Sequence, residues 1–115
     1  MIKKINNDRY EKKTRDKKKY RYEKKTDLNK SDETTEYLDL QSKQISSIIC
    51  LSHLTNLIKL DVSNNQLTSL PPLPRNLKIL NCFLNHLTSL PVLPSDLRIL
   101  ICDRNNLHAL PKLND

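Results

Sequence analysis

The sequence predicts an α/β-type solenoid, a short curved array of repeats with a parallel sheet of about four strands on its concave side. One pattern, L-x-x-L-x-[VC]-x-x-N-x-L, occurs in phase at residues 57–67, 77–87 and 97–107. The connecting residues repeat as well, because LTSLPPLP at 67–74 returns as LTSLPVLP at 87–94. A fixed period of this kind indicates units that bury their apolar faces against their neighbours.

The chain divides into a basic tail with its linker, residues 1–34, and a repeat domain, residues 35–115. Residues 1–30 hold 13 Lys and Arg against 5 Asp and Glu, while residues 31–115 hold 7 against 8, so the net charge of +7 comes from the tail. The tail has almost no aliphatic side chains whose burial would offset the entropy of ordering it. We therefore expect the tail to be disordered or weakly helical.

The first repeat, residues 35–45, is degenerate, because Thr35 replaces the first leucine of the pattern and Lys43 replaces its asparagine. An atypical terminal unit is expected in such an array, since its outer side faces water. The second unit spans 22 residues and has an apolar side chain at every third position of residues 45–57. It contains no proline, which favours a short 3₁₀ or α turn on its outer side.

Each repeat also predicts one short strand followed by a turn. Residues two apart share one face of a strand, and the predicted inward pairs are Leu60/Val62, Leu80/Cys82 and Leu100/Cys102. The turn must satisfy backbone groups inside the array, and asparagine offers both a donor and an acceptor on a short stem. The asparagines at this position, which we predict to form a structural ladder, are Asn65, Asn85 and Asn105.

The outer halves of the later units carry prolines, which cannot continue a helix or donate to a strand ladder. These prolines include Pro71, Pro74, Pro91, Pro94 and Pro111. We therefore expect extended, polyproline II-like backbone there, and a convex side that is mostly polyproline II and 3₁₀ in conformation.

Two segments resemble leucine-rich repeat proteins. Residues 45–66 are similar to the 22-residue class typified by phosphatase-regulatory subunits, and residues 67–106, with their L-P-x-L-P motif, resemble the 20-residue repeats of secreted bacterial effectors. The resemblance covers residues 35–115 and implies a horseshoe that binds protein through its concave face. It implies no enzyme, because the effectors that are ubiquitin ligases carry their catalytic cysteine in a separate domain after the repeats, and this sequence ends at Asp115.

The outward positions of the strands are the candidate site for a protein partner. They are Tyr37, Lys59, Asp61, Ile79, Asn81, Phe83, Ile99, Ile101 and Asp103. Apolar residues gather on the last two strands, and exposed apolar clusters beside charge are typical of interaction sites. Two alternatives remain open: Leu84 and some of the isoleucines pack beneath a neighbouring unit, or the cluster reflects sequence drift.

The basic tail is a second candidate site, for nucleic acid or an anionic surface. Its cations are Lys12, Lys13, Arg15, Lys17, Lys18, Lys19, Arg21, Lys24 and Lys25. Tyr20 and Tyr22 lie among them, so the segment offers side chains that contact phosphates and stack on bases. The alternative is a solvated run of charge, because five acidic residues interrupt it.

The cysteines and histidines predict neither a metal nor a cofactor. Cys82 and Cys102 occupy the inward position that Val62 holds, so we interpret them as small core residues, with Cys50 partly exposed. No paired C-x₂-C or H-x₃-H spacing is present to hold zinc. The Cys102-Asp103 pair has no base at a defined spacing, and we predict no catalytic activity.

The sequence has no signal-peptide core and no apolar run near ~18 residues, which predicts an intracellular setting, in the cytoplasm or the nucleus. Secretion by a route independent of a signal peptide stays open. The last unit lacks a polar cap, so we expect either a truncated member of a longer family or end-to-end self-association through residues 99–103, near Arg104. A third alternative is that the tail folds back as a cap.

Overall fold

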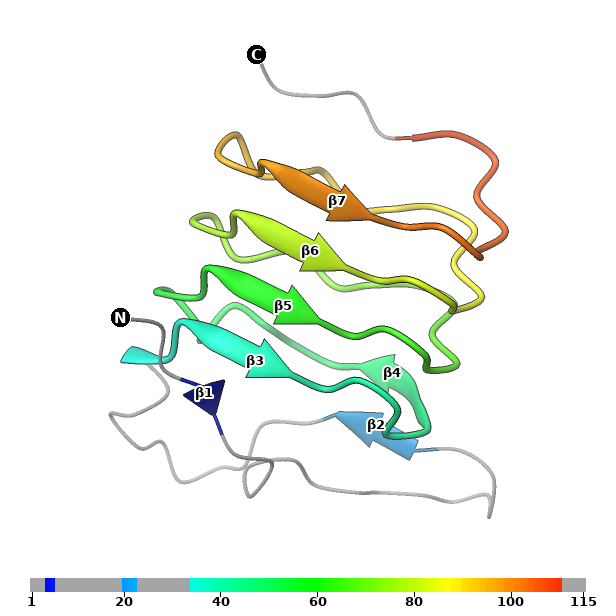
Figure 1. Ribbon diagram of the computed structural model, residues 1–115, viewed down its shortest axis with the longest axis horizontal. Coiled ribbons are helices and arrows are strands. Elements are labelled where there is room, and N and C mark those ends of the chain that lie inside the picture. Colours follow the sequence, from blue (N-terminus) through cyan, green and yellow to red (C-terminus); the bar gives the residue numbers. More distant parts are fainter. Residues whose placement is uncertain (1–3, 6–19, 23–33, 111–115) are drawn as a thin grey trace.

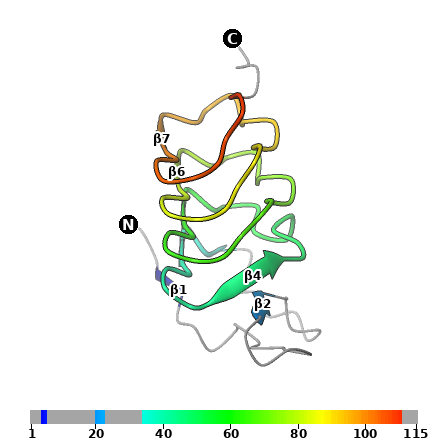
Figure 2. The same ribbon diagram turned by 90° about the vertical axis from the view of Figure 1, so that its right-hand side faces the viewer.

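A computed structural model describes residues 4–5, 20–22 and 34–110, which form a stack of coils with one strand of a common sheet per coil (Figures 1 and 2). This arrangement confirms the predicted solenoid. None of the described residues forms a helix that is long and apolar enough to cross a lipid bilayer.

The main sheet is parallel throughout and has the strand order β1-β3-β5-β6-β7. Its strands are β1 (Lys4–Ile5), β3 (Tyr37–Asp39), β5 (Lys59–Asp61), β6 (Ile79–Asn81) and β7 (Ile99–Ile101). The last four are the strands that the repeats predict, and they lie side by side in Figure 1. Each is only three residues long, because the chain turns into the next part of the coil directly afterwards.

A second, two-stranded parallel sheet joins β2 (Tyr20–Tyr22) to β4 (Ile45–Ile48). At β1 and β2 the structure has strand where the sequence analysis expects disorder or weak helix. Strand pairing uses backbone groups, which a polar segment possesses as fully as an apolar one, and the first coil offers open edges at β3 and β4. The low aliphatic content of the tail therefore did not exclude these pairings.

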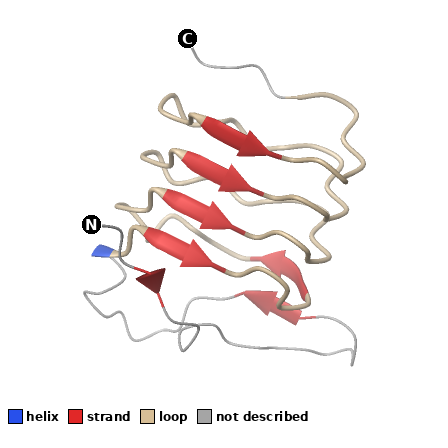
Figure 3. Ribbon diagram, in the orientation of Figure 1, coloured by secondary structure: helices blue, strands red, loops and turns tan. Residues whose placement is uncertain are grey.

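The convex side is made of turns and extended segments, with no helix in residues 35–110 (Figure 3). In the 22-residue unit, the expected 3₁₀ or α turn is replaced by two isolated backbone hydrogen bonds, each between residues three apart in the sequence. In these, the amide of Leu54 donates to the carbonyl of Leu51 at 3.0 Å and that of Leu57 to Leu54 at 3.1 Å. In the later coils the amides of Leu77 and Leu97 donate in the same way to proline carbonyls, at 3.2 and 3.1 Å.

The core is a column of leucines stacked between the sheet and the convex side. Fully buried members from successive coils are Leu40, Ile45, Leu54, Leu57, Leu60, Val62, Leu67, Leu77, Leu80, Cys82 and Leu87. Their equivalents in the last coil are only partly buried: Leu97, Leu100, Cys102 and Leu107. Burial therefore decreases towards β7, where the described residues place no further coil against the sheet.

Each turn after β3, β5, β6 and β7 has a left-handed residue at the same repeat position, although the sequence contains no glycine, and the first turn has a second one at Gln44 (φ 59°). The residues at the shared position and their φ values are Ser42 (56°), Asn64 (55°), Leu84 (57°) and Arg104 (60°). Each directly precedes the repeat position at which the later coils have asparagine. The turn therefore reverses the chain at that point, before the asparagine side chain enters the coil.

Candidate protein-binding surface

The strand register places the predicted contact residues in two rows across the sheet. One row is Tyr37, Lys59, Ile79 and Ile99, and the other is Asp39, Asp61, Asn81 and Ile101. The residue between the two rows on β3, β5 and β6 is a buried leucine, so the rows lie on the face opposite the core. Phe83 and Asp103 follow β6 and β7 at equivalent positions.

Four side chains of this face form what we name the apolar patch: Ile79, Phe83, Ile99 and Ile101. Phe83 is 36% exposed, Ile99 48% and Ile101 39%, while Ile79 is half-buried. Ile79 and Ile99 are paired across β6 and β7, which sets their strands about 4.8 Å apart. Leu84, in the adjoining turn, is 42% exposed, so it does not pack beneath a neighbouring unit.

The N-terminal half of the concave face is polar. The Nζ atom of Lys59 lies 5.0 Å from the centre of the Tyr37 ring, a cation–π contact between adjacent strands. This contact directs the Lys59 side chain towards β3, and no apolar residue takes part in either row there. The patch is thus confined to β6 and β7 and the turn that follows β6.

The second row has a structural use that the sequence analysis missed. The carboxylate of Asp39, the carboxylate of Asp61 and the amide oxygen of Asn81 each accept a hydrogen bond from the backbone amide two residues later, at 3.1, 3.0 and 3.1 Å. The same Asp61 oxygen also accepts from the Ser63 hydroxyl at 2.6 Å, and Asp61 is only 7% exposed. We therefore remove Asp61 from the candidate contact residues. The recurrence of Asp or Asn at the strand end was the signal for this role, and Ile101 departs from it.

The three predicted ladder asparagines point into the coils and link each coil to the one before it. Asn65 accepts from the amides of Lys43 and Ile45, at 3.1 and 2.9 Å, and donates to the carbonyl of Leu40 at 2.9 Å. Asn85 and Asn105 repeat the bonds equivalent to those with Ile45 and Leu40 one and two coils later. This ladder holds the turns in place, so it fixes the position of Phe83 at the end of the patch.

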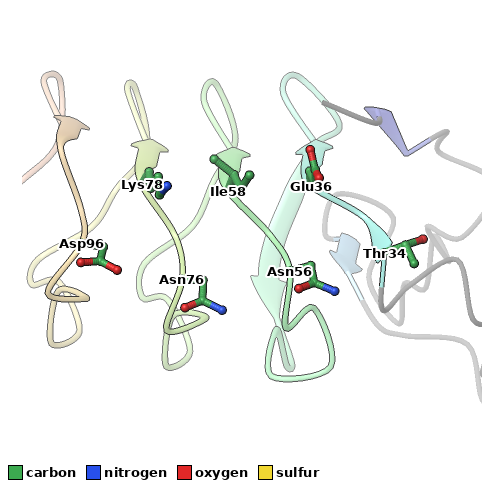
Figure 4. A pocket seen from close by; sticks show the side chains of 7 residues that line it. All are labelled: Thr34, Glu36, Asn56, Ile58, Asn76, Lys78 and Asp96. Carbon is green, nitrogen blue, oxygen red and sulfur yellow. The ribbon is translucent and has the colours of Figure 1, made fainter. Parts of the chain in front are cut away.

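A shallow groove of about 520 Å³ runs along the side of the array where the chain enters the strands (Figure 4). Its lining residues are Thr34, Glu36, Asn56, Ile58, Asn76, Lys78 and Asp96. Asn76 is held there by a hydrogen bond from its Nδ2 atom to the carbonyl of Thr55 at 3.1 Å. One lining residue of the groove, Lys78, directly precedes Ile79 of the apolar patch at the start of β6.

A solved structure of YopM from Yersinia enterocolitica WA-314 has the same coil architecture. It is 38% identical to this chain and superimposes with a TM-score of 0.67, over 72% of this chain and 18% of YopM. The chain belongs to the leucine-rich repeat proteins. Its 20-residue coils with the L-P-x-L-P motif are of the bacterial-effector-like class, and they follow a 22-residue unit.

The leucine-rich repeat chain spans less than a fifth of the length of YopM, since the match covers 18% of that protein. No family model and no curated protein matches the chain. The assignment to the leucine-rich repeat proteins therefore rests on the structural match and the repeat pattern. Leucine-rich repeat modules generally bind proteins.

Cys82 and Cys102 lie on successive coils of the repeat module that the chain shares with YopM. Cys82 is fully buried, and that burial, with the neighbouring Cys102 thiol, raises its pKa to about 12. Burial and the Asp103 carboxylate also raise the pKa of Cys102. Both thiols therefore stay protonated near neutral pH and are poor nucleophiles. Among the residues that the structure describes, no cluster of His, Cys, Asp or Glu is able to hold a metal ion.

Most of the predicted tail site lies outside the described residues. This holds for Lys12, Lys13, Arg15, Lys17, Lys18, Lys19, Lys24 and Lys25. The exception is Arg21, whose backbone lies in β2 and is paired with Ser47 of β4. The basic run of the leucine-rich repeat chain is therefore paired with the first coil of the array through the backbone of β2.

Proposed function

We propose that this chain is a protein-interaction module that binds its partner through the concave face, with the apolar patch at the centre of the contact. The observation that carries the proposal is the exposure of Phe83, Ile99 and Ile101 on one face, at 36%, 48% and 39%. Burying such side chains against a partner removes apolar surface from water, which is the main driving force of association. The partner is a protein, in keeping with the general use of leucine-rich repeats.

The proposal is tested with the intact chain as bait and site-specific photo-crosslinking. Benzoylphenylalanine is introduced at Ile99 in the patch and, in a second bait, at Val92, which is 71% exposed in the proline-rich part of the third coil. We expect a protein that crosslinks from position 99 and not from position 92. Ile101→Lys should abolish retention of the same protein, while Val92→Lys should leave it unchanged.

Folding of each bait is checked by circular dichroism, because a bait that has unfolded says nothing about a surface. A partner that crosslinks equally from both positions, and that Ile101→Lys still retains, would show that the concave face is not the binding surface.

A second candidate function is favoured by the charge of the tail, with 13 Lys and Arg against 5 Asp and Glu in residues 1–30. In this function the tail binds nucleic acid or an anionic surface, and the repeats serve as a spacer. Deleting the tail would also uncover β3 and β4, since β1 and β2 pair with them. Lys→Gln changes at Lys17, Lys18 and Lys19 are therefore the better test, because they remove charge outside both strands.

If the tail supplies the affinity, binding of duplex DNA or of anionic vesicles should weaken steeply between low and moderate salt, and the triple variant should reduce the salt dependence. Binding through the apolar patch should respond little to either change. Loss of binding with Ile101→Lys alone would exclude the tail as the main site.

An intracellular location, in the cytoplasm or the nucleus, is also part of the proposal. Its support is that Cys50, Cys82 and Cys102 are all free thiols, as is usual in a reducing compartment. Imaging of the tagged chain in its own cells tests the location, and recovery of the chain from the culture medium with the cells intact would contradict it.

A further inference from the structure

Two neighbouring cations, Lys78 and Arg98, lie at the edge of the apolar patch next to Ile79, and the backbone amide of Arg98 donates to the carbonyl of Lys78 at 2.8 Å. A third cation, Lys59, is paired with Ile79 across β5 and β6, but its Nζ atom lies over the Tyr37 ring, on the side away from the patch. Lys78 and Arg98 directly precede Ile79 and Ile99, at the ends of the strands where the chain enters the sheet. None of these three cations forms an ion pair with another residue of the described part of the chain.

Opposing charges lie in the groove and at the far end of the patch. Asp96 lines the same groove as Lys78, and Asp103 follows β7 at the far end of the patch, where Arg104 adjoins it. Glu36 also lines the groove, but it belongs to the first coil, two coils away from Lys78. The corner at Ile79 therefore carries an excess of positive charge, while the patch itself is uncharged.

We propose that the segment this surface recognises is acidic and apolar: an apolar side chain packs on the apolar patch, and carboxylates of the same segment contact Lys78 and Arg98. The inference rests on the proposed function and specifies the chemistry of the partner. Complementary charge of this kind orients the segment and speeds its association, while burial of the apolar side chain supplies the affinity.

The spacing within the segment follows from the strand. Arg98 directly precedes β7 and is three residues from Ile101, which is about 10 Å at the rise of a strand. An extended partner covers the same distance with three residues. Side chains of an extended segment that face the same surface are an even number of residues apart, so the carboxylate should lie two or four residues from the apolar side chain.

The test is a selection of binders from a random peptide library against the intact chain, followed by affinity measurements on labelled synthetic peptides. We expect selected peptides to combine a large apolar residue with Asp or Glu at about that spacing. Replacing Asp and Glu in such a peptide by Asn and Gln should weaken binding about tenfold, which corresponds to about 1.4 kcal/mol. Replacing its apolar residue by Ala should weaken binding by at least as much.

The matching change in the protein is the double variant Lys78→Glu and Arg98→Glu, which should weaken binding of the acidic peptide about tenfold and restore it for a peptide with Lys in place of the acids. Arg75→Glu is the control, since Arg75 is an exposed cation beside the prolines of the outer side. Circular dichroism confirms that each variant is folded.

The outcomes separate the inference from the proposed function. Peptides without acidic residues, whose binding is lost with Ile101→Lys and unaffected by the double variant, would overturn the acidic chemistry and leave the concave site in place. Peptides whose binding survives Ile101→Lys would overturn both. Recovery of no binding peptide would overturn the inference that a linear segment is recognised, while crosslinking from position 99 would still test the concave face.

Discussion

The amide oxygen of Asn85 accepts a hydrogen bond from the backbone amide of Leu67 in the preceding coil, at 3.0 Å. The Nδ2 atom of the same residue donates to the carbonyl of Val62 at 3.0 Å and to that of Cys82 at 3.2 Å. One side chain thus satisfies buried backbone groups on both sides of a coil boundary, and no apolar residue of similar size is able to do so.

Replacing Asn85 by alanine should therefore lower the free energy of unfolding by about 1–3 kcal/mol or more, because it leaves these buried backbone groups without partners. Asn81→Ala is the matched comparison, since Asn81 makes one exposed bond to the Phe83 amide and should cost at most about 1 kcal/mol. Urea denaturation of both variants measures the difference. Equal losses would mean that the two asparagines do not differ in burial as the structure has them.

A second prediction concerns Leu84, which holds a left-handed conformation at φ 57°. A residue with a β-carbon other than Asn or Asp is strained there by about 1–2 kcal/mol. Asn64 occupies the same position one coil earlier, at φ 55°. Leu84→Asn should therefore raise the free energy of unfolding by about 1 kcal/mol, since the leucine is 42% exposed and loses little packing.

Leu84→Ala serves as the control for this gain, because alanine removes the same side chain and keeps the strain of the β-carbon. Thermal melting of the two variants decides the question. If the alanine variant is as stable as the asparagine variant, the gain does not come from the backbone conformation.

Cys82 should make the stability depend on pH in the alkaline range. Burial raises the pKa of its thiol from 9.0 to about 12, so the thiol stays protonated in the folded chain at a pH where it ionises in the unfolded chain. The unfolded state then binds fewer protons, and stability falls as the pH rises from about 9 towards 12, by at most about 1.4 kcal/mol per pH unit.

The variant that isolates this effect is Cys82→Val, since Val62 fills the equivalent position one coil earlier. Urea unfolding of both chains at several values between about pH 8 and about pH 11 should show a shallower decline for the variant. Parallel declines would show that Cys82 does not titrate differently in the two states.

The patch residues should be replaceable without unfolding the chain. Ile101→Lys should change the free energy of unfolding by about 0.5 kcal/mol or less, and Phe83→Ala should lower it by about 1 kcal/mol, because both side chains are substantially exposed. Leu80→Ala, at a fully buried position of β6, should cost about 2–5 kcal/mol in the same measurement. Losses of that size at Phe83 or Ile101 would identify the patch as core.

The features that repeat along the sequence could be predicted from it. The period of 20 residues predicts that Ile79 lies beside Ile99 and that Asn85 and Asn105 occupy equivalent positions in adjacent coils. Equivalent residues of adjacent coils must be neighbours when the strands form a parallel sheet. Exposure of the patch follows from the same periodicity, since it decides which positions point away from the core.

The remaining features depend on backbone geometry that side-chain patterns encode weakly. Asp61 looks like a surface carboxylate in the sequence, yet it is buried by its bonds to the amide and hydroxyl of Ser63. The pairing of β1 with β3 and of β2 with β4 uses backbone groups, which carry no sequence signature. The groove beside Lys78 arises from how successive coils stack, so no single repeat reveals it.

The final prediction concerns the decline of burial towards β7. Leu80 is fully buried between coils, whereas Leu100 at the same position of the last described strand is only partly buried. Leu100→Ala should therefore cost clearly less than the ~2–5 kcal/mol expected for Leu80→Ala, because fewer contacts are lost. This comparison applies to the chain at low concentration, where a second copy does not cover the end.

Self-association through residues 99–103, with Arg104 near the junction, would change that result in a defined way. A second copy against β7 would bury Leu100, so the cost of Leu100→Ala would rise with protein concentration while the cost of Leu80→Ala would stay constant. Sedimentation velocity over the same concentration series would show the dimer directly. If Leu100→Ala costs as much as Leu80→Ala in a chain that stays monomeric throughout, another part of the chain must cover the last coil.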